Sequence, residues 1–149
     1  MNDEIVQALI IAPHAKETKE LSDHLEHLPE VSVEVECYAD VPLAIQRLLQ
    51  KPAHVVFMDS AFADADEVVG QIKEVCGDCS IVAMTKAENE SASLELLRSG
   101  VDDFLVKGPF SLFAVVLVMH HAVMVSRLRR EYRRALELKR VAQRQLEDK

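Results

Sequence analysis

The chain has 149 residues, of which 49% are hydrophobic and 28% charged, with a formal net charge of −8 at pH 7. This length and apolar content predict one domain with a substantial core and room for a short appendage. The acidic N-terminus Met1-Asn-Asp-Glu4 lacks the basic segment of a secretory signal, and three cysteines argue against a disulfide framework, so we expect a cytoplasmic protein.

Short apolar runs along the first 110 residues predict five strands. Ile5 to Ala12 is typical of a buried strand, and Ser32 to Tyr38 alternates apolar and acidic residues, as a half-exposed edge strand does. Three further runs are too short for helices and predict strands buried on both faces: His54 to Asp59, Ser80 to Thr85 and Asp103 to Lys107.

Helical periodicity fills the gaps between these strands. The predicted helices are Lys16 to Leu28, Pro42 to Gln50, Asp66 to Val75, Ser91 to Ser99, and a last helix that begins near Leu112 and meets no Pro or Gly through Lys149. We expect Leu49 in the second helix, and Leu94 and Leu97 in the fourth, to be buried. Because helices separate the strands, the strands should be parallel and joined by right-handed crossovers.

Polar residues end the last three predicted strands: Asp59, Thr85 and Lys107. In a parallel sheet the carboxyl ends of the strands share one edge, where ligands bind. A carboxylate, a hydroxyl and an ammonium should therefore meet in one crevice. The carboxylate can attack a phosphoryl group to form an acyl phosphate, and the other two groups can bind its oxygens.

The segments Val55-Val-Phe-Met-Asp59, Met84-Thr85 and Gly100-Val-Asp-Asp-Phe-Leu-Val-Lys107 have the order and spacing of response regulator receiver domains. Over roughly residues 5 to 126 the chain resembles that family. The resemblance implies an α/β, flavodoxin-like, doubly wound five-stranded parallel sheet of order 2-1-3-4-5. It also implies that Asp59 is the phosphoacceptor candidate, that Thr85 and Lys107 bind the phosphoryl group, and that Phe104 is the aromatic switch residue. The alternative for Phe104 is an ordinary half-buried strand aromatic.

The chain departs from the family where the first strand ends. Receivers usually carry two acidic residues there that help to bind magnesium, whereas this chain has Pro13 and His14. Proline offers no side-chain ligand and imidazole is a poor one for this hard cation. The remaining implied ligands, Asp59 and the carbonyl of Ala61, leave at most a weak Mg²⁺ site. We therefore expect impaired phosphoryl transfer, with Asp59 either a remnant salt-bridged to Lys107 or an acceptor whose missing acids are compensated.

Charge divides the chain near residue 126. Residues 127–149 carry nine Lys/Arg and four Asp/Glu, a net +5, while residues 1–126 carry −13. This predicts a receiver-like domain over 1–126 and a basic helical extension over 127–149. Apolar steps of three and four residues in the extension predict a coiled coil, with a solvated single helix as the alternative. The predicted seam is Val125, Leu128, Tyr132, Ala135, Lys139, Ala142 and Leu146.

We expect the last helix to form a homodimer. The proposed second face, beside the seam, is Val115, Val118, Ala122 and Val125. Nucleic-acid binding is not favoured, because the tail has one aromatic residue and the protein is acidic. Membrane insertion is not expected either, because the apolar stretch Leu112 to Val125 is too short to span a bilayer.

The motif Cys76-Gly-Asp-Cys79 invites a redox or metal interpretation. It lies between the third helix and the fourth strand, at the sheet edge opposite Asp59. No second cysteine pair completes a zinc site, and Gly-Asp is typical of a turn. A plain turn is therefore preferred.

These observations predict a signal-transduction receiver module that is not an enzyme, is impaired in phosphorylation and relays a conformational signal through its dimerisation helix. The resemblance implies a histidine kinase or other signalling protein as partner, and a C-terminal output domain. Two alternatives stay open. The first is a conventional phosphoacceptor receiver that uses Asp59. The second is a pseudo-receiver scaffold of an RNA-binding antitermination regulator.

Overall fold

The computed structural model describes residues 4–86 and 90–148. The strands are β1 (Val6–Ile11), β2 (Val33–Tyr38), β3 (Val55–Asp59), β4 (Ser80–Thr85) and β5 (Asp103–Val106). The helices are α1 (Ala15–Glu26), α2 (Val41–Gln50), α3 (Ala65–Val75), α4 (Glu90–Ser99) and α5 (Leu112–Glu147). All strand pairs are parallel, in the order β2-β1-β3-β4-β5, which confirms the predicted flavodoxin-like fold.

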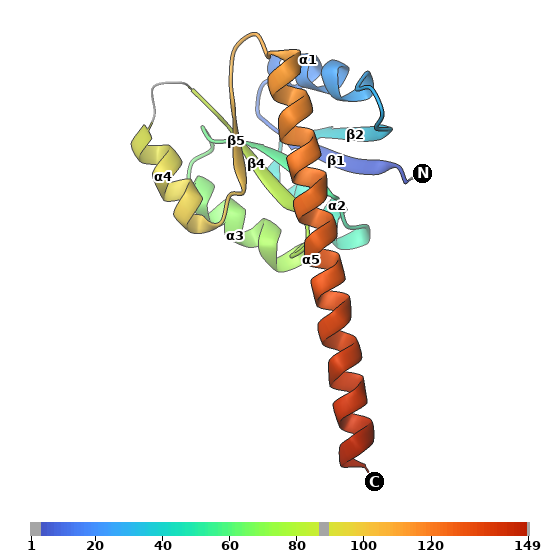
Figure 1. The fold of residues 1–149 in the computed structure, drawn as a ribbon. Coiled ribbons are helices and arrows are strands. Elements are labelled where there is room, and N and C mark those ends of the chain that lie inside the picture. Colours follow the sequence, from blue (N-terminus) through green and yellow to red (C-terminus); the bar gives the residue numbers. More distant parts are fainter. Residues whose placement is uncertain (1–3, 87–89, 149) are drawn as a thin grey trace.

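The sheet separates two layers of helices, each with its own apolar core. Residues of α1 and α5 pack with one face of the sheet, and residues of α2, α3 and α4 pack with the other (Figure 1). Successive residues of β1 alternate between the two cores: Ala8 and Ile10 face α1 and α5, whereas Leu9 and Ile11 face the other layer. Burial on both faces explains why β1, β3 and β4 are continuous apolar runs, and the alternating β2 is the predicted edge strand.

Three predicted core positions are wrong. Leu49, Leu94 and Leu97 are 66%, 54% and 51% exposed, and α4 buries Leu96 instead. The C-terminus of α4 explains its rotation. The amide N–H of Gly100 donates to the carbonyl of Leu97, and that of Val101 donates to Leu96, with Gly100 at φ +114°. This Schellman motif brings Val101 beside Leu96 as the chain enters β5, so Leu96 points inward.

In α2 the helical stripe that faces the sheet contains Ala44 and Leu48. Leu49 lies about 100° further around the helix, beyond that stripe. Its exposure shows that the apolar content of a helix face overestimates the width of the buried part.

Helix α5 has 36 residues and extends well past the body of the domain (Figure 1). Its buried residues are Val115, Met119, Ala122, Val123 and Ser126. This corrects the expected second face, because Val115 and Ala122 pack in the core with the sheet. Exposed apolar side chains lie elsewhere on the helix: Phe113, Leu117, Met124, Leu128, Tyr132, Leu138 and Leu146.

By length and composition alone, α5 also meets the requirements of a membrane-crossing helix. The core helix of a globular domain meets the same requirements, and one third of the most apolar window of α5 is buried against the rest of the domain. Packing on the sheet therefore accounts for much of its apolar character.

Candidate functional site

The carboxyl edge of the sheet brings Asp59 and Lys107 into direct contact. Asp59 is the last residue of β3 and is fully buried, and Lys107 follows β5 with its side chain 9% exposed. The ammonium of Lys107 forms an ion pair with Oδ1 of Asp59. The backbone N–H of Lys107 donates to the carbonyl of Thr85 at 2.7 Å, so β4 fixes the position from which the lysine reaches across.

The two oxygens of the Asp59 carboxylate have different surroundings. Oδ1 accepts a hydrogen bond from the backbone N–H of Ala61 at 2.8 Å in addition to the ion pair with Lys107. Oδ2 is buried and has no hydrogen-bond partner within the described residues. A buried, unsatisfied carboxylate oxygen is energetically costly and is a candidate ligand or nucleophile.

Thr85 ends β4, is 6% exposed, and lies beside Val106 in the register of β4 and β5. Phe104 is half-buried on β5, where its ring packs against the core formed with α2, α3 and α4. Thr85 is thus on the expected edge, and Phe104 lies three residues before Lys107 with contact to the helical layer. Their phosphoryl-binding and switch roles stay predictions.

The residues in place of the acidic pair are exposed and offer no carboxylate. Pro13 lies between β1 and α1, and His14 is the N-cap of α1 without a side-chain capping bond. Among the residues described, no group of three or more His, Cys, Asp or Glu side chains could hold a metal ion. Asp59 and the Ala61 carbonyl are too few oxygen ligands for the octahedral shell of Mg²⁺, so the donor set does not fit a dedicated magnesium site.

A second polar cluster lies at the opposite, amino edge of the sheet, where α5 leaves the domain. The guanidinium of Arg129 binds both carboxylate oxygens of Asp102, one of them at 3.0 Å, and donates to the carbonyl of Cys79 at 2.9 Å. Asp102 also accepts from the backbone N–H of Ile81 at 2.8 Å. This bidentate arrangement joins α5 to the start of both β4 and β5.

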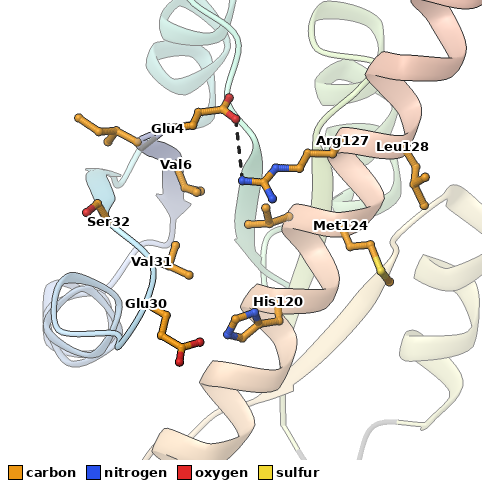
Figure 2. Close-up of a pocket in the computed structure, with 11 residues that line it drawn as sticks. Glu4, Val6, Glu30, Val31, Ser32, His120, Met124, Arg127 and Leu128 are labelled. Atoms are coloured by element: carbon orange, nitrogen blue, oxygen red, sulfur yellow. Dashed lines mark ion pairs between the residues drawn. The ribbon is translucent and has the colours of Figure 1, made fainter. Parts of the chain in front are cut away.

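Three more arginines of α5 contact acidic residues of the domain. Arg133 forms an ion pair with Asp78, and Arg130 and Arg127 approach Glu4 at 3.3 and 3.9 Å. We refer to these four arginines and their partners Glu4, Asp78 and Asp102 as the α5 anchor. Figure 2 shows Arg127 reaching Glu4 across one end of a pocket of about 1000 Å³ between α5 and the start of β1 and β2.

The buried side chain of His54 extends the α5 anchor into the domain. Its Nδ1 accepts from the backbone N–H of Gln7 at 2.9 Å, and its Nε2 lies 2.9 Å from a carboxylate oxygen of Glu4. Burial lowers the pKa of His54, and the hydrogen bond to Glu4 opposes that shift only in part. The imidazole is therefore favoured in its neutral form.

Sequence reasoning placed these arginines in a basic helical extension and missed the α5 anchor. Two signals could have found it. Asp102 directly precedes β5, and Asp78 lies two residues before β4, so both lie at the amino edge. Helix α5 must pass that edge because it follows β5 and runs back along the sheet. Arg129 and Arg133 are four residues apart and so share a helix face.

Comparison with known proteins agrees with this architecture. No protein-family model matches the sequence, and no curated protein matches it significantly. By contrast, 251 chains of solved structures match. NtrX from Brucella abortus in complex with ATP has a TM-score of 0.77 at 20% identity, over 89% of this chain and 29% of that chain. The chain thus spans less than a third of that NtrX.

In two further matches the aligned region covers nearly all of the matched chain. The receiver domain of NtrX from Brucella abortus has a TM-score of 0.70 at 19% identity, over 78% of this chain and 98% of that chain. A structure described as adenylate cyclase from Rhodopirellula baltica has a TM-score of 0.75 at 15% identity, over 90% and 98%. At these identities the likeness establishes the fold: this chain has the fold of response regulator receiver domains.

Proposed function

We propose that this chain is a cytoplasmic, non-enzymatic receiver module in which phosphorylation at Asp59 is impaired. The observation that carries the proposal is the environment of Asp59: a fully buried carboxylate, ion-paired with Lys107, with Pro13 and His14 where receivers have acids. The receiver fold supports a role in signal transduction, and the departures at its edge support the impairment.

The chemistry of phosphoryl transfer explains why those departures matter. The transferred group carries charge on three oxygens, and catalysis consists mainly of positioning and charge neutralisation. Lys107 can supply one positive charge, but in this structure it is already paired with Oδ1 of Asp59. Oδ2 is the only carboxylate oxygen left to attack, and it is buried. Phosphorylation would require both a rearrangement of this pair and a second source of positive charge.

The proposal includes self-association through α5. Eight of its exposed apolar residues lie within about 60° of one line along the helix: Phe113, Leu117, Met124, Leu128, Tyr132, Ala135, Ala142 and Leu146. Leu112, Leu138 and Val141 are exposed outside this stripe. Steps of three and four residues recur along this line, as in helices that pair in coiled coils. A second copy carries the same stripe and is therefore a matching partner. The dimer face that we propose is this stripe, in place of the one containing Val115 and Ala122.

The other partners follow from the fold class alone. Receiver modules respond to a histidine kinase or another signalling protein and act on an output domain, and we propose the same for this chain. The projecting end of α5 supports this proposal, because residues beyond the α5 anchor contact little of the domain and are available to a following segment.

The decisive experiment restores the missing acids. A Pro13→Asp/His14→Asp variant and the natural protein are each titrated with Mg²⁺ and then incubated with acetyl phosphate, and the acyl phosphate is trapped. We expect the natural protein to show no saturation by Mg²⁺ at low millimolar concentration and little label, and the variant to gain both. Adding Asp59→Asn to the variant should remove the label.

Two results would contradict the proposal. Saturation of the natural protein well below millimolar Mg²⁺, or rapid labelling at Asp59, would favour a conventional phosphoacceptor receiver. Label that persists in the Asp59→Asn variant would show that the acceptor is a different residue.

Sedimentation tests the dimer separately. Truncation after Ser126 would also remove most of the α5 anchor, so truncation after Arg134 is the cleaner variant. We expect it to weaken the dimer more than Leu128→Glu or Leu146→Glu, because truncation removes three positions of the stripe whereas each substitution places a charge at one. Arg140→Glu serves as a control for charge alone. A natural protein that sediments as a monomer at tens of micromolar would exclude this assembly.

A further inference from the structure

The turn that joins α3 to β4 holds its two cysteines close together. Cys76 is the C-cap of α3, and the backbone N–H of Cys79 donates to the carbonyl of Cys76 at 3.3 Å. This bond closes a four-residue turn, whose end Cα atoms lie within about 7 Å of each other. A disulfide requires a Cα separation below about 7 Å, so the backbone already satisfies its main geometric condition.

The two thiols form an unequal pair. Hydrogen bonding with the Cys79 thiol lowers the pKa of the Cys76 thiol to about 6, and the Cys76 thiol donates to the carbonyl of Ala53 at 3.5 Å. The same hydrogen bond, together with burial, raises the pKa of Cys79. The inequality favours Cys76 over Cys79 as the thiol that ionises first, and the thiolate is the nucleophilic form of cysteine.

A small reagent has a route to Cys76. Although the residue is only 5% exposed, it lines a pocket of about 490 Å³ at the amino edge of the sheet. Lys51, Arg130 and Arg133 line the same pocket, together with Glu4 and Asp78, which pair with the two arginines. A polar pocket of this kind can admit a small polar oxidant such as hydrogen peroxide.

We propose that Cys76 and Cys79 form a thiol-oxidation site, in which a hydroperoxide converts the pair into an intrachain disulfide. This site is independent of the proposed role of Asp59, because it lies at the opposite edge of the sheet. The sequence alone favoured a plain turn, because no second cysteine pair completes a zinc site and Gly-Asp is typical of a turn. A disulfide needs no second pair, and the turn itself brings the two thiols together.

The reaction balances in two steps with hydrogen peroxide. The Cys76 thiolate attacks one peroxide oxygen, the O–O bond breaks, and the released hydroxide takes up a proton to become water, leaving Cys76 as a sulfenic acid. The Cys79 sulfur then attacks the Cys76 sulfur, the S–O bond breaks, and the departing hydroxide combines with the Cys79 proton as a second water. Two thiols lose two electrons, and the peroxide gains them.

Oxidation would act on the α5 anchor, because the same turn supplies two of its attachments. The Cys79 carbonyl accepts from Arg129, and Asp78, between the two cysteines, pairs with Arg133. Joining the two sulfurs by a covalent bond of about 2 Å would change the turn that carries both groups. We expect the contacts of α5 near residues 129–133 to loosen.

The test uses a Cys37→Ser background, since Cys37 is the exposed third cysteine. Hydrogen peroxide is added to the folded protein, and free thiols and intact mass are followed. We expect both thiols to disappear together, with the loss of two hydrogen atoms in mass and recovery by dithiothreitol. Hydrogen exchange should rise over residues 127–134 of the oxidised protein relative to the reduced protein.

Single-thiol variants in that background provide the matched controls. Cys79→Ser keeps a hydroxyl that can donate to Cys76, and it should trap a sulfenic acid at Cys76 that dimedone labels. Cys76→Ser should react with hydrogen peroxide at least about fivefold more slowly than Cys79→Ser at pH 7, because its remaining buried thiol, Cys79, has little thiolate. A pair that reacts only in urea, or that gains oxygen without losing both thiols, would overturn the proposal.

Discussion

The two edges of the sheet differ in how their described charged groups are organised. At the carboxyl edge, Asp59 and Lys107 form one buried pair with an unsatisfied carboxylate oxygen, and Pro13 and His14 stand where receivers carry acids. At the amino edge, four arginines of α5 contact Glu4, Asp78 and Asp102, and His54 and a strand amide join the same network. The edge at which receivers perform chemistry is sparse, whereas the edge that holds α5 is densely connected.

The two edges should therefore respond differently to the loss of a single charged group. A buried charge pair such as Asp59 and Lys107 is sensitive to the loss of either member, because the remaining charge stays buried. A network of partly exposed pairs loses less when one member is removed, because water and other partners replace the contact. Removing single groups at each edge therefore tests the comparison.

The largest effect is expected for Lys107→Ala. It leaves the fully buried Asp59 carboxylate without its counter-charge and should lower the free energy of unfolding by about 3–5 kcal/mol. Urea unfolding followed by circular dichroism measures the change. The double variant Asp59→Leu/Lys107→Met, which removes both charges, should recover most of the loss. A cost below about 1 kcal/mol for the single variant would mean that the pair is solvated, like an exposed ion pair.

A smaller effect is expected for Asp102→Asn at the opposite edge. It weakens the bidentate contact with Arg129 but keeps one oxygen to accept from the N–H of Ile81, so we expect a loss of about 1–3 kcal/mol. Hydrogen exchange should rise in the part of α5 around Arg129 while the start of the helix stays protected. Arg140→Gln, on the projecting end, is the control and should change neither quantity. Equal exchange along all of α5 would contradict the anchoring role.

The smallest effect is a pH dependence from His54. Burial lowers its pKa in the folded protein below the value of about 6.5 in the unfolded chain. Between those two values the unfolded chain binds more protons, so stability is present above the unfolded pKa and falls as the pH drops through this window. The slope from one group cannot exceed about 1.4 kcal/mol per pH unit. His54→Gln should reduce the pH dependence of the free energy of unfolding below pH 6.5. An unchanged dependence would show that other groups cause it.

The parallel sheet and the meeting of Asp59 and Lys107 followed from the apolar runs, because the carboxyl ends of parallel strands share one edge. The strand order 2-1-3-4-5 came from the resemblance to receiver domains. The extent of α5 was also predicted closely, from the lack of Pro and Gly. The orientation of helices about their own axes was less predictable. Leu94 and Leu97 look like a core face, yet the Schellman bond from Val101 to Leu96 sets the rotation of α4.

The α5 anchor was missed for a related reason. The sequence pattern of an arginine-rich helix is the same whether the arginines contact water, a second helix or their own domain. Only the path of α5 along the sheet brings Arg129 to Asp102 and Arg133 to Asp78. Long-range ion pairs of this kind have no local periodicity, so they become visible only after the topology is known.

The continuity of α5 has a mechanical consequence. From Arg133 to Glu147 the helix rises about 21 Å beyond its last attachment, without a residue that would bend it, so a tilt of about 10° at the attachment moves the far end by about 4 Å. The projecting helix would thus move as a rigid rod that pivots about its attachment at the amino edge of the sheet. A displacement too small to alter the core would arrive at the far end as a shift comparable to the spacing between neighbouring strands.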